Sequence, residues 1–287
     1  MSYVIGVDVG STYTKALILS PEKEVVGHAM TPTGFKLDKA SEKVFNKILK
    51  DAGLAKDEIG YAISTGYGRH MVPYRDITVT DLTATARGSN YFFPDTRTVL
   101  DIGGQTMKAS RLDDKVKVKS FRLNDKCAAG TGAFLEKTAR YMGYETEEIG
   151  PLVQTSKEDI PISGVCAVFA ESEVINQLSL GSAPSDIMHG AMSSLVKRAI
   201  QLLKRVKMES QITLTGGIMR FKTMIDVLTE NVEEKINVPQ GDMVHHVTFG
   251  HINFFFYIFC QNIDHCFKAH DTARECEIGR ASCRERV

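Results

Sequence analysis

The sequence lacks the features that would direct the chain to nucleic acid, to a membrane or out of the cell. Its 35 Lys and Arg residues balance 35 Asp and Glu residues, so we expect no electrostatic surface for nucleic acid or an anionic membrane. The longest largely apolar stretch, 252–260, has nine residues including Asn253, about half of the ~20 that a membrane-spanning helix requires. The N-terminus has no basic segment before its first apolar residues. We therefore expect no secretory signal and a cytoplasmic location.

Common nucleotide motifs and a disulfide framework are also missing. Neither GxxxxGK[ST] nor GxGxxG occurs, which disfavours P-loop ATPases and Rossmann dehydrogenases. Six cysteines in 287 residues are too few for a secreted disulfide framework, so each is a buried apolar residue, a reactive thiol or a metal ligand. The hydrophobic fraction of 43% is ordinary for a globular protein, and the length favours two lobes with separate cores.

One β-turn-β pattern occurs twice. Alternating or continuous apolar residues predict strands over 3–9, 15–20 and about 24–30, then a helix over 38–52 that ends at Gly53, and a strand over 61–65. Residues 99–109 repeat the beginning of this unit in register: Asp8 aligns with Asp101, Gly10 with Gly103, Lys15 with Lys108 and Ala16 with Ala109. Duplication of one unit explains the register, and chance similarity of two short segments is the alternative.

The rest of the chain divides into a second lobe and a tail. Apolar spacing predicts helices over about 130–142, 166–180, 186–206 and 221–230, with a strand over 211–215 before the last of them. We expect an N-terminal lobe over 1–95 and a second lobe over 96–248. The tail, 249–287, holds six of the 14 Phe residues and four of the six Cys residues without helical or alternating period. We interpret it as out-of-frame or adaptor-derived sequence, and a genuine variable C-terminus is the alternative.

Three glycine turns at strand ends predict phosphate binding. They occupy 8–12, 101–105 and 216–217. Glycines and small hydroxyl residues let backbone N–H groups approach phosphate oxygens, and a carboxylate at the strand end can hold Mg²⁺ through water. A single turn of this kind is weak evidence, but three turns, two of them in matched register, together favour a nucleotide site.

The segments GVDVGSTYTK, DIGGQTMK and LTGGI resemble the phosphate and adenosine motifs of the acetate-kinase/sugar-kinase/Hsp70/actin superfamily. The resemblance implies an α/β fold of two duplicated actin-like lobes that hold ATP and Mg²⁺ between them. It also implies roles for individual residues: Gly10, Ser11, Thr12, Lys15, Gly103 and Gly104 at the phosphates, Asp8 and Asp101 near Mg²⁺, Gly216 and Gly217 against the nucleotide, and Gln105 orienting the attacking water.

Two cysteines precede predicted helices. Cys127 lies in DKCAAGTG, and Cys166 lies 39 residues later in VCAVFAESEVI. A helix N-terminus lowers a thiol's pKa and stabilises an anionic cluster, although a small buried hydrophobe is the alternative for each residue. A [4Fe–4S] cluster usually takes four thiolates, and the chain without its tail has two. If both bind metal, a second subunit must supply the other two ligands, and a zinc site would face the same shortage.

These cysteine segments, together with TGYGR at 65–69, resemble the BadF/BadG family of ATPases. The resemblance implies a [4Fe–4S] cluster bound by Cys127 and Cys166 at the interface with an identical or paralogous ATPase subunit. It implies that ATP hydrolysis drives one electron from a low-potential donor such as ferredoxin to a partner. Residues 79–94 are more similar to the ATPase subunit of benzoyl-CoA reductase, which implies benzoyl-CoA-binding reductase subunits as partners.

Three alternatives stay open. Within the family, the chain could be an activator of a 2-hydroxyacyl-CoA dehydratase. On the same fold it could be a metabolite kinase, for which the sequence offers no convincing catalytic Asp, or a non-catalytic actin-like scaffold.

Members of the family end with a helix rich in small residues, and the chain departs from that pattern after residue 242. Glu171 and Glu173 are expected to favour the dipole of their helix.

Overall fold

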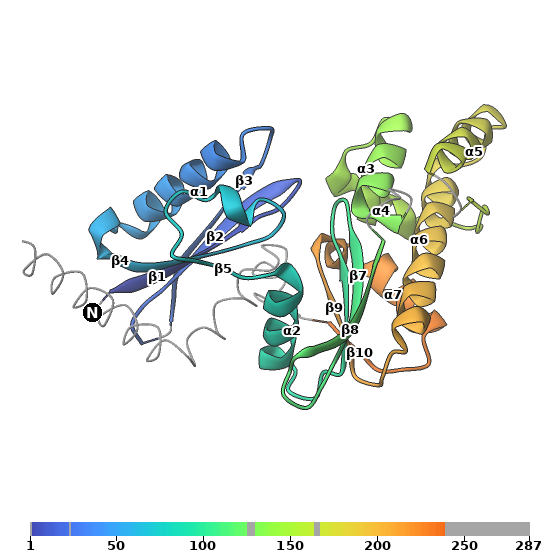
Figure 1. Cartoon of the computed structure of the whole chain (residues 1–287). Coiled ribbons are helices and arrows are strands. Elements are labelled where there is room, and N and C mark those ends of the chain that lie inside the picture. The colour runs from blue at the N-terminus through green and yellow to red at the C-terminus, as the bar shows by residue number, and fades with distance from the viewer. Residues whose placement is uncertain (1, 23, 125–129, 164–166, 239–287) are drawn as a thin grey trace, which may run out of the picture.

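The computed structural model describes residues 2–22, 24–124, 130–163 and 167–238, which form two lobes (Figure 1). The first lobe is built on a five-stranded sheet in the order β3-β2-β1-β4-β5. Its strands are β1 (Tyr3–Val9), β2 (Tyr13–Leu19), β3 (Val25–Pro32), β4 (Ile59–Thr65) and β5 (Ile77–Thr78). The second sheet has the order β8-β7-β6-β9-β10. Its strands are β6 (Thr98–Ile102), β7 (Met107–Leu112), β8 (Val118–Asn124), β9 (Ile212–Thr215) and β10 (Ile236–Asn237).

The two sheets repeat one topology in one register. Each begins with an antiparallel three-stranded meander. A parallel strand then pairs with the first strand of the meander, and a second parallel strand pairs with that one at the sheet edge. Asp8 pairs with Lys15 in the first sheet, and Asp101 pairs with Lys108 in the second. The duplication predicted from the sequence is therefore confirmed at the level of single residue pairs.

In the first lobe, α1 (Leu37–Ala52) covers one face of the sheet. Its predicted apolar stripe is buried against the strands, and Gly53 ends it with a φ of 69°. Glycine adopts this left-handed conformation without steric cost, which is why it ends the helix here. Short 3-10 turns flank β4 at Lys56–Glu58 and Arg69–Met71.

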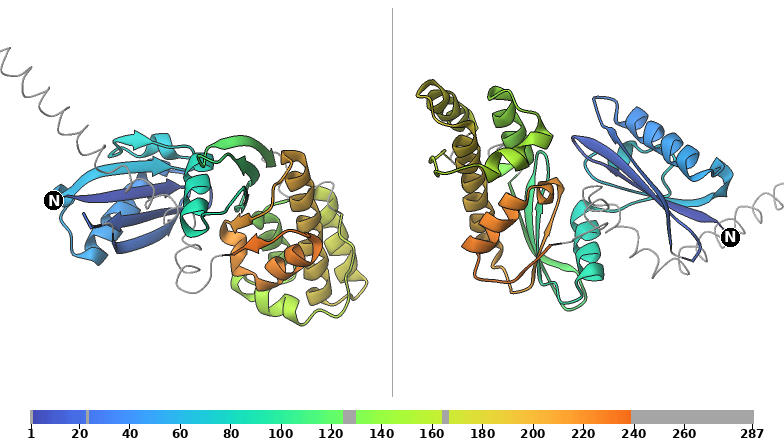
Figure 2. Two further views of the ribbon diagram at one scale, coloured as in Figure 1. Left: turned by 90° about the horizontal axis from the view of Figure 1, so that it is seen from below. Right: turned by 180° about the vertical axis from the view of Figure 1, so that it is seen from behind.

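In the second lobe, helices cover the face of the sheet that lies away from the first lobe (Figure 2). They are α3 (Gly132–Tyr141), α4 (Ile149–Gln154), α5 (Ala167–Ser179), α6 (Pro184–Val206) and α7 (Lys222–Asn231), with 3-10 turns at Thr146–Glu148 and Gly217–Arg220. The long helix α6 carries the predicted stripe, whose members are all buried: Ile187, Ala191, Leu195, Ala199, Leu202 and Val206. α6 is thus the central support of this lobe.

Helix α2 (Asp81–Phe92) was not predicted, and it lies between the two sheets in every ribbon view (Figures 1 and 2). Ala84 belongs to the core on the face of the first sheet opposite α1, whereas Ala86 packs with Val99 and Leu112 of the second sheet. Positions two residues apart along a helix, such as Ala84 and Ala86, are rotated by about 200° around its axis. The two alanines therefore face opposite lobes. Small residues let both sheets approach α2 closely, and they also remove the apolar stripe by which sequence reasoning finds helices.

No helix in the described part of the chain has the length and apolar character needed to cross a membrane.

Candidate functional site

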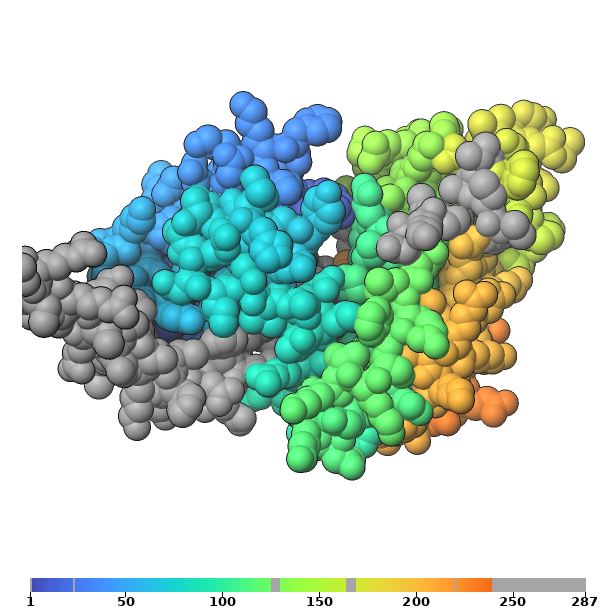
Figure 3. All heavy atoms as spheres, viewed as in Figure 1, coloured from blue at the N-terminus to red at the C-terminus, as the bar shows by residue number. Residues whose placement is uncertain are grey.

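The β1–β2 and β6–β7 turns have the same construction and meet between the lobes. The N–H of Gly10 donates to the Tyr13 carbonyl at 3.1 Å, and the N–H of Gly103 donates to the Thr106 carbonyl at 2.9 Å. A Cβ atom on Gly104 would lie 2.6 Å from the hydroxyl oxygen of Thr12. The two predicted phosphate turns therefore approach each other closely across the lobes. The space-filling view shows a furrow between the two lobes (Figure 3).

Different elements hold the two turns. In the first lobe, Thr33 donates its hydroxyl to the Gly10 carbonyl at 2.9 Å and its N–H to the Thr12 carbonyl at 3.0 Å. In the second lobe, the first N–H groups of α3 hold the turn. Those of Gly132 and Ala133 donate to the carbonyls of Gly103 and Gly104 at 3.0 and 2.8 Å. The β6–β7 turn and helix α3 thus form one hydrogen-bonded unit.

Two buried carboxylates lie behind the turns. Asp8 and Asp101 lie one residue before the ends of the central strands β1 and β6, and they are 2% and 3% exposed. Each faces a glycine with positive φ that follows the neighbouring parallel strand, Gly66 at 86° and Gly216 at 95°. A Cβ atom on Gly216 would lie 2.9 Å from Oδ1 of Asp101, and one on Gly66 would collide with the Asp8 carboxylate. Both glycines therefore make room for a carboxylate.

Replacing Gly66 by Ala is expected to destabilise the protein by about 3 kcal/mol or more, because the added methyl group collides with Asp8 in addition to straining the backbone. Gly53→Ala is the matched control: its φ is also positive, but the added atom would meet nothing within 4 Å. We expect that control to cost about 1 kcal/mol. Urea unfolding monitored by circular dichroism measures both values, and equal losses would contradict the close packing of Gly66 on Asp8.

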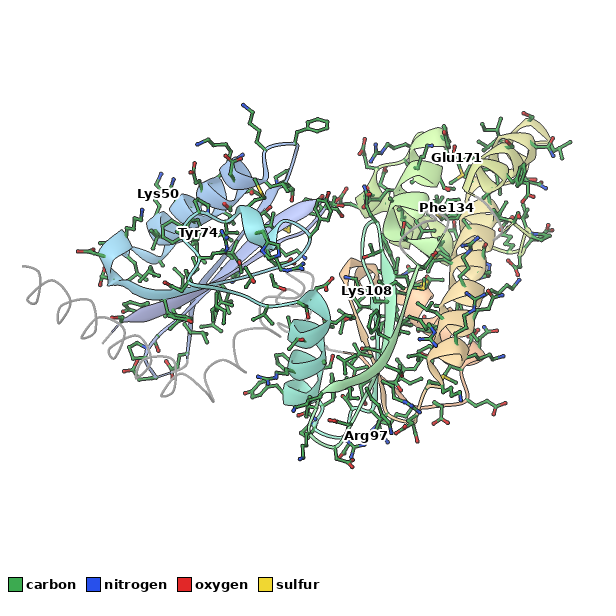
Figure 4. The ribbon with its side chains drawn as sticks, viewed as in Figure 1. Lys50, Tyr74, Arg97, Lys108, Phe134 and Glu171 are labelled. Atoms are coloured by element: carbon green, nitrogen blue, oxygen red, sulfur yellow. The ribbon has the colours of Figure 1, made fainter. Side chains whose placement is uncertain are left out.

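Two lysines lie beside the carboxylates. Nζ of Lys15 is 3.9 Å from Oδ2 of Asp8, and Nζ of Lys108 is 3.7 Å from Oδ2 of Asp101. Lys108 also donates to Asp81 at the start of α2, so it joins three elements (Figure 4). Burial alone would lower the pKa of Lys108, but the carboxylates of Asp101, Asp81 and Asp8 raise it above its ordinary value. Lys108 therefore stays charged at neutral pH.

Sequence reasoning found part of this arrangement. It aligned Lys108 with Lys15 but gave Lys108 no role, and it missed Asp81. The signal for Lys108 was the shared register. The signal for Asp81 was weaker: Thr80 precedes it as a helix cap whose hydroxyl accepts from the N–H of Thr83 at 3.2 Å. The pairing of Asp81 with Lys108 spans 27 residues and depends on how α2 crosses between the lobes.

The remaining predicted residues occupy the turns and the end of β9. Ser11 and Gln105 are exposed, and Thr12, Gly103 and Gly104 are half-buried. Gly216 contacts Asp101 and the Ile102 carbonyl group, whereas a side chain on Gly217 would meet nothing within 4 Å. The structure thus brings together the residues predicted from all three turns.

The residues present fit Mg²⁺ and nucleotide phosphates. Thr215 donates to Asp101 at 3.3 Å, whereas the hydroxyl of its counterpart Thr65, buried beside Asp8, finds no hydrogen-bond partner among the described residues. A buried hydroxyl of this kind usually has a partner, so Thr65 leaves a donor and acceptor beside Asp8 that a bound group could use. Asp8 and Asp101 are hard oxygen donors of the kind that Mg²⁺ takes, commonly through water, and the glycine turns present N–H groups to phosphate.

The predicted metal ligands lie outside the described residues. This applies to Cys127 and Cys166, and to the other four cysteines, which belong to the tail. Within the described ranges, no group of three or more His, Cys, Asp and Glu side chains is arranged to hold a metal ion. The geometry of the site described above therefore concerns the nucleotide alone.

Two duplicated α/β lobes with glycine turns facing each other define an actin-like ATPase fold. The chain belongs to the BadF/BadG/BcrA/BcrD ATPase family, whose sequence model matches residues 5–246. The tail from residue 249 onward lies outside that match.

Relatives with assigned activities include two kinds of protein. The chain is 40% identical over 218 residues to the activator of lactoyl-CoA dehydratase from Anaerotignum propionicum, covering 76% of this chain and 84% of the relative. It is 32% identical over 243 residues to one of the subunits of benzoyl-CoA reductase from Thauera aromatica, covering 82% and 85%. The identity is thus higher with the dehydratase activator.

Solved structures agree with the family assignment. The activator of the 2-hydroxyisocaproyl-CoA dehydratase from Clostridium difficile, with bound ADPNP, superposes with a TM-score of 0.84 at 32% identity, covering 93% of this chain and 97% of the other. A ROK family glucokinase from Streptomyces griseus superposes with a TM-score of 0.53 at 12% identity, covering 90% and 99%, which shows the shared fold alone.

Proposed function

We propose that the protein hydrolyses ATP and couples the hydrolysis to delivery of one low-potential electron to a partner that acts on a coenzyme A ester. The observation that carries the nucleotide part is the contact between Thr12 and Gly104, because it places two phosphate-type turns from opposite lobes around one point. The electron-transfer part rests on the two cysteines and on the named activities of the relatives.

In this proposal the turns hold the phosphates and the buried groups behind them balance charge. Backbone N–H groups of 11–12 and 104–105 would point to phosphate oxygens, while Asp8 and Asp101 would hold Mg²⁺ through water. Bound Mg²⁺ would neutralise charge that develops on the phosphates during hydrolysis. Gln105 orients a water molecule whose oxygen bonds to the γ-phosphorus, as the bond from that phosphorus to ADP breaks.

Cys127 and Cys166 would supply two thiolates to a [4Fe–4S] cluster. Cys166 directly precedes α5, and Cys127 precedes α3 by five residues. Two ligands are half of the usual four, so a second ATPase subunit, identical or paralogous, completes the site. When bound, the cluster would supply one-electron chemistry: it would take one electron from a reduced ferredoxin-like donor and pass it to the partner.

Two partners remain candidates. The identity of 40% with the lactoyl-CoA dehydratase activator favours a 2-hydroxyacyl-CoA dehydratase. The likeness of residues 79–94 favours benzoyl-CoA-binding reductase subunits. Co-purification of the native partner followed by ATP-dependent assays with lactoyl-CoA and benzoyl-CoA separates the two.

A metabolite kinase is a weaker alternative. Asp81, at the start of the inter-lobe helix, is a carboxylate that a kinase could use as a base. Its carboxylate is already engaged by the charged Lys108, which makes it a poor proton acceptor. A hydrolase that uses an oriented water molecule needs no such base.

Anaerobic purification with iron and sulfide analysis, electron paramagnetic resonance and an ATPase assay tests the proposal. We expect about four iron atoms per dimer, a signal from the reduced cluster and hydrolysis without an added acceptor. Colourless, iron-free protein would remove the electron-transfer role. ATP turnover only with an added phosphate acceptor would favour the kinase.

A further inference from the structure

Helix α5 carries two glutamates with defined partners on other elements. Oε1 of Glu171 accepts from Nζ of Lys137 at 2.6 Å, and Oε2 of Glu171 accepts from the Tyr141 hydroxyl at 3.2 Å. Nζ of Lys137 also lies 5.7 Å from the centre of the Tyr141 ring. Oε2 of Glu173 accepts from the N–H of Ser163 at 2.5 Å. Glu171, which Figure 4 labels, therefore joins α5 to α3, and Glu173 joins α5 to the chain before residue 164.

These contacts differ from the role expected from the sequence. The helix begins at Ala167, so both glutamates follow its first turn, where the effect of the helix dipole fades. Each side chain instead accepts hydrogen bonds from a particular donor. The lysine that Glu171 contacts has its pKa raised by that hydrogen bond. Glu171 is thus a specific link between two helices.

Helix α3 leads from this link back to the nucleotide site. Its first two N–H groups are bonded to the carbonyls of Gly103 and Gly104 in the β6–β7 turn. A Cβ atom on Gly132 would lie 3.4 Å from the Gly103 carbonyl oxygen, so the helix and the turn are in direct backbone contact. Residues four apart lie on one face of a helix, so Lys137 and Tyr141 both face α5.

We infer that Glu171 is a positioning residue that makes α5 follow α3 when the β6–β7 turn shifts during the nucleotide cycle. Phe134, Leu135 and Ala139 are buried on the inner side of α3, so the helix moves as a packed body with the turn. The Lys137–Glu171–Tyr141 contacts then carry the displacement to α5. The inference rests on the proposed function in one respect: α5 begins directly after Cys166, so a movement of α5 would reach the proposed cluster ligand.

The Lys137–Glu171 contact can be removed without unfolding the protein, because it contributes little to the free energy of unfolding. The Lys137 side chain is 52% exposed and that of Glu171 is 19% exposed. Partly exposed ion pairs add little to global stability. Removing the link should therefore leave a folded protein whose α5 responds less to nucleotide.

Hydrogen exchange of the full chain, with ADP and with a non-hydrolysable ATP analogue, tests this inference. In wild-type protein we expect the nucleotide to change protection in the β6–β7 turn, in the first turn of α3 and in α5. In Glu171→Gln and Lys137→Met we expect the change at the turn to persist and the change in α5 to fall to about half or less. The charge-reversed double variant Lys137→Glu with Glu171→Lys should restore part of it.

Lys222→Met is the matched control, because Lys222 and Asp226 form an equally short ion pair of 2.6 Å on α7. It should leave the response of α5 unchanged. A response of α5 that is the same in Glu171→Gln as in wild type, or absent from wild type itself, would overturn the inference. Hydrogen exchange with either nucleotide can be measured on protein without iron. An iron-free protein would therefore refute the electron-transfer proposal, and the hydrogen-exchange experiment would still decide whether α5 follows α3.

Discussion

Replacing Cys127 by Ala is expected to remove essentially all iron from the anaerobically purified protein. In a symmetric dimer the substitution deletes one ligand from each subunit and leaves two thiolates where a [4Fe–4S] cluster usually takes four. In the proposed dimer the shared cluster would also link the two subunits, so its loss should shift the protein towards monomer. Iron and sulfide analysis measures the first effect, and analytical ultracentrifugation measures the second. Cys166→Ala should give the same result.

Cys276→Ala is the control for this experiment. It makes the same chemical change in the tail, outside the residues that match the family, and should leave the iron content and the dimer unchanged. A Cys127→Ala protein that keeps its full complement of iron would show that this thiol is not a ligand. Iron lost in the Cys276 variant as well would mean that the tail takes part in the site.

The sequence was sufficient to predict the repeated strand-turn-strand unit and the carboxylates at its centre. The spacing across the turn is the same in both units, so aligning Asp8 with Asp101 also aligned Lys15 with Lys108, and the observed strand pairing has this register. Helices with a continuous apolar stripe, such as α6, were predicted within about two residues of their ends. Local pattern and turn chemistry agree with the fold in these segments, which is why they could be predicted.

The inter-lobe connections could not be predicted. Helix α2 packs on both sides with alanines, so no one-sided stripe marks it, and β5 and β10 are two-residue edge strands with too few residues for a pattern. The partners of Lys108 and Glu171 come from elements 27 and 30 or more residues away. Such contacts arise from tertiary packing rather than from local spacing.

The structural role of Gly66 also could not be predicted from the sequence. Its segment TGYGR contributed to the family resemblance, but its physical role was not apparent. A positive φ and close approach to the Asp8 carboxylate become visible only when β4 is placed beside β1. The duplication could have suggested this role, since Thr65-Gly66 and Thr215-Gly216 occupy equivalent places beside Asp8 and Asp101.

Replacing Asp101 by Asn is expected to lower ATP turnover by about 10²–10³-fold, because it removes a charge from the point where Mg²⁺ and developing phosphate charge would be stabilised. The fold should survive. Asn keeps an oxygen to accept from Thr215, and Lys108 keeps its contact with Asp81. The pKa of Lys108 should fall towards its ordinary value, since Asp101 is the first of the carboxylates that raise it. Steady-state ATPase assays across a Mg²⁺ titration measure the effect.

Asp113→Asn provides the same charge change in the same lobe, at the exposed turn between β7 and β8. Asp113 accepts there from the N–H groups of Lys115 and Lys117, both at 2.9 Å, and Asn can accept the same bonds. Its turnover should stay within about twofold of wild type. If Asp101→Asn also turned over at the wild-type rate with an unchanged Mg²⁺ requirement, Asp101 would have no part in hydrolysis.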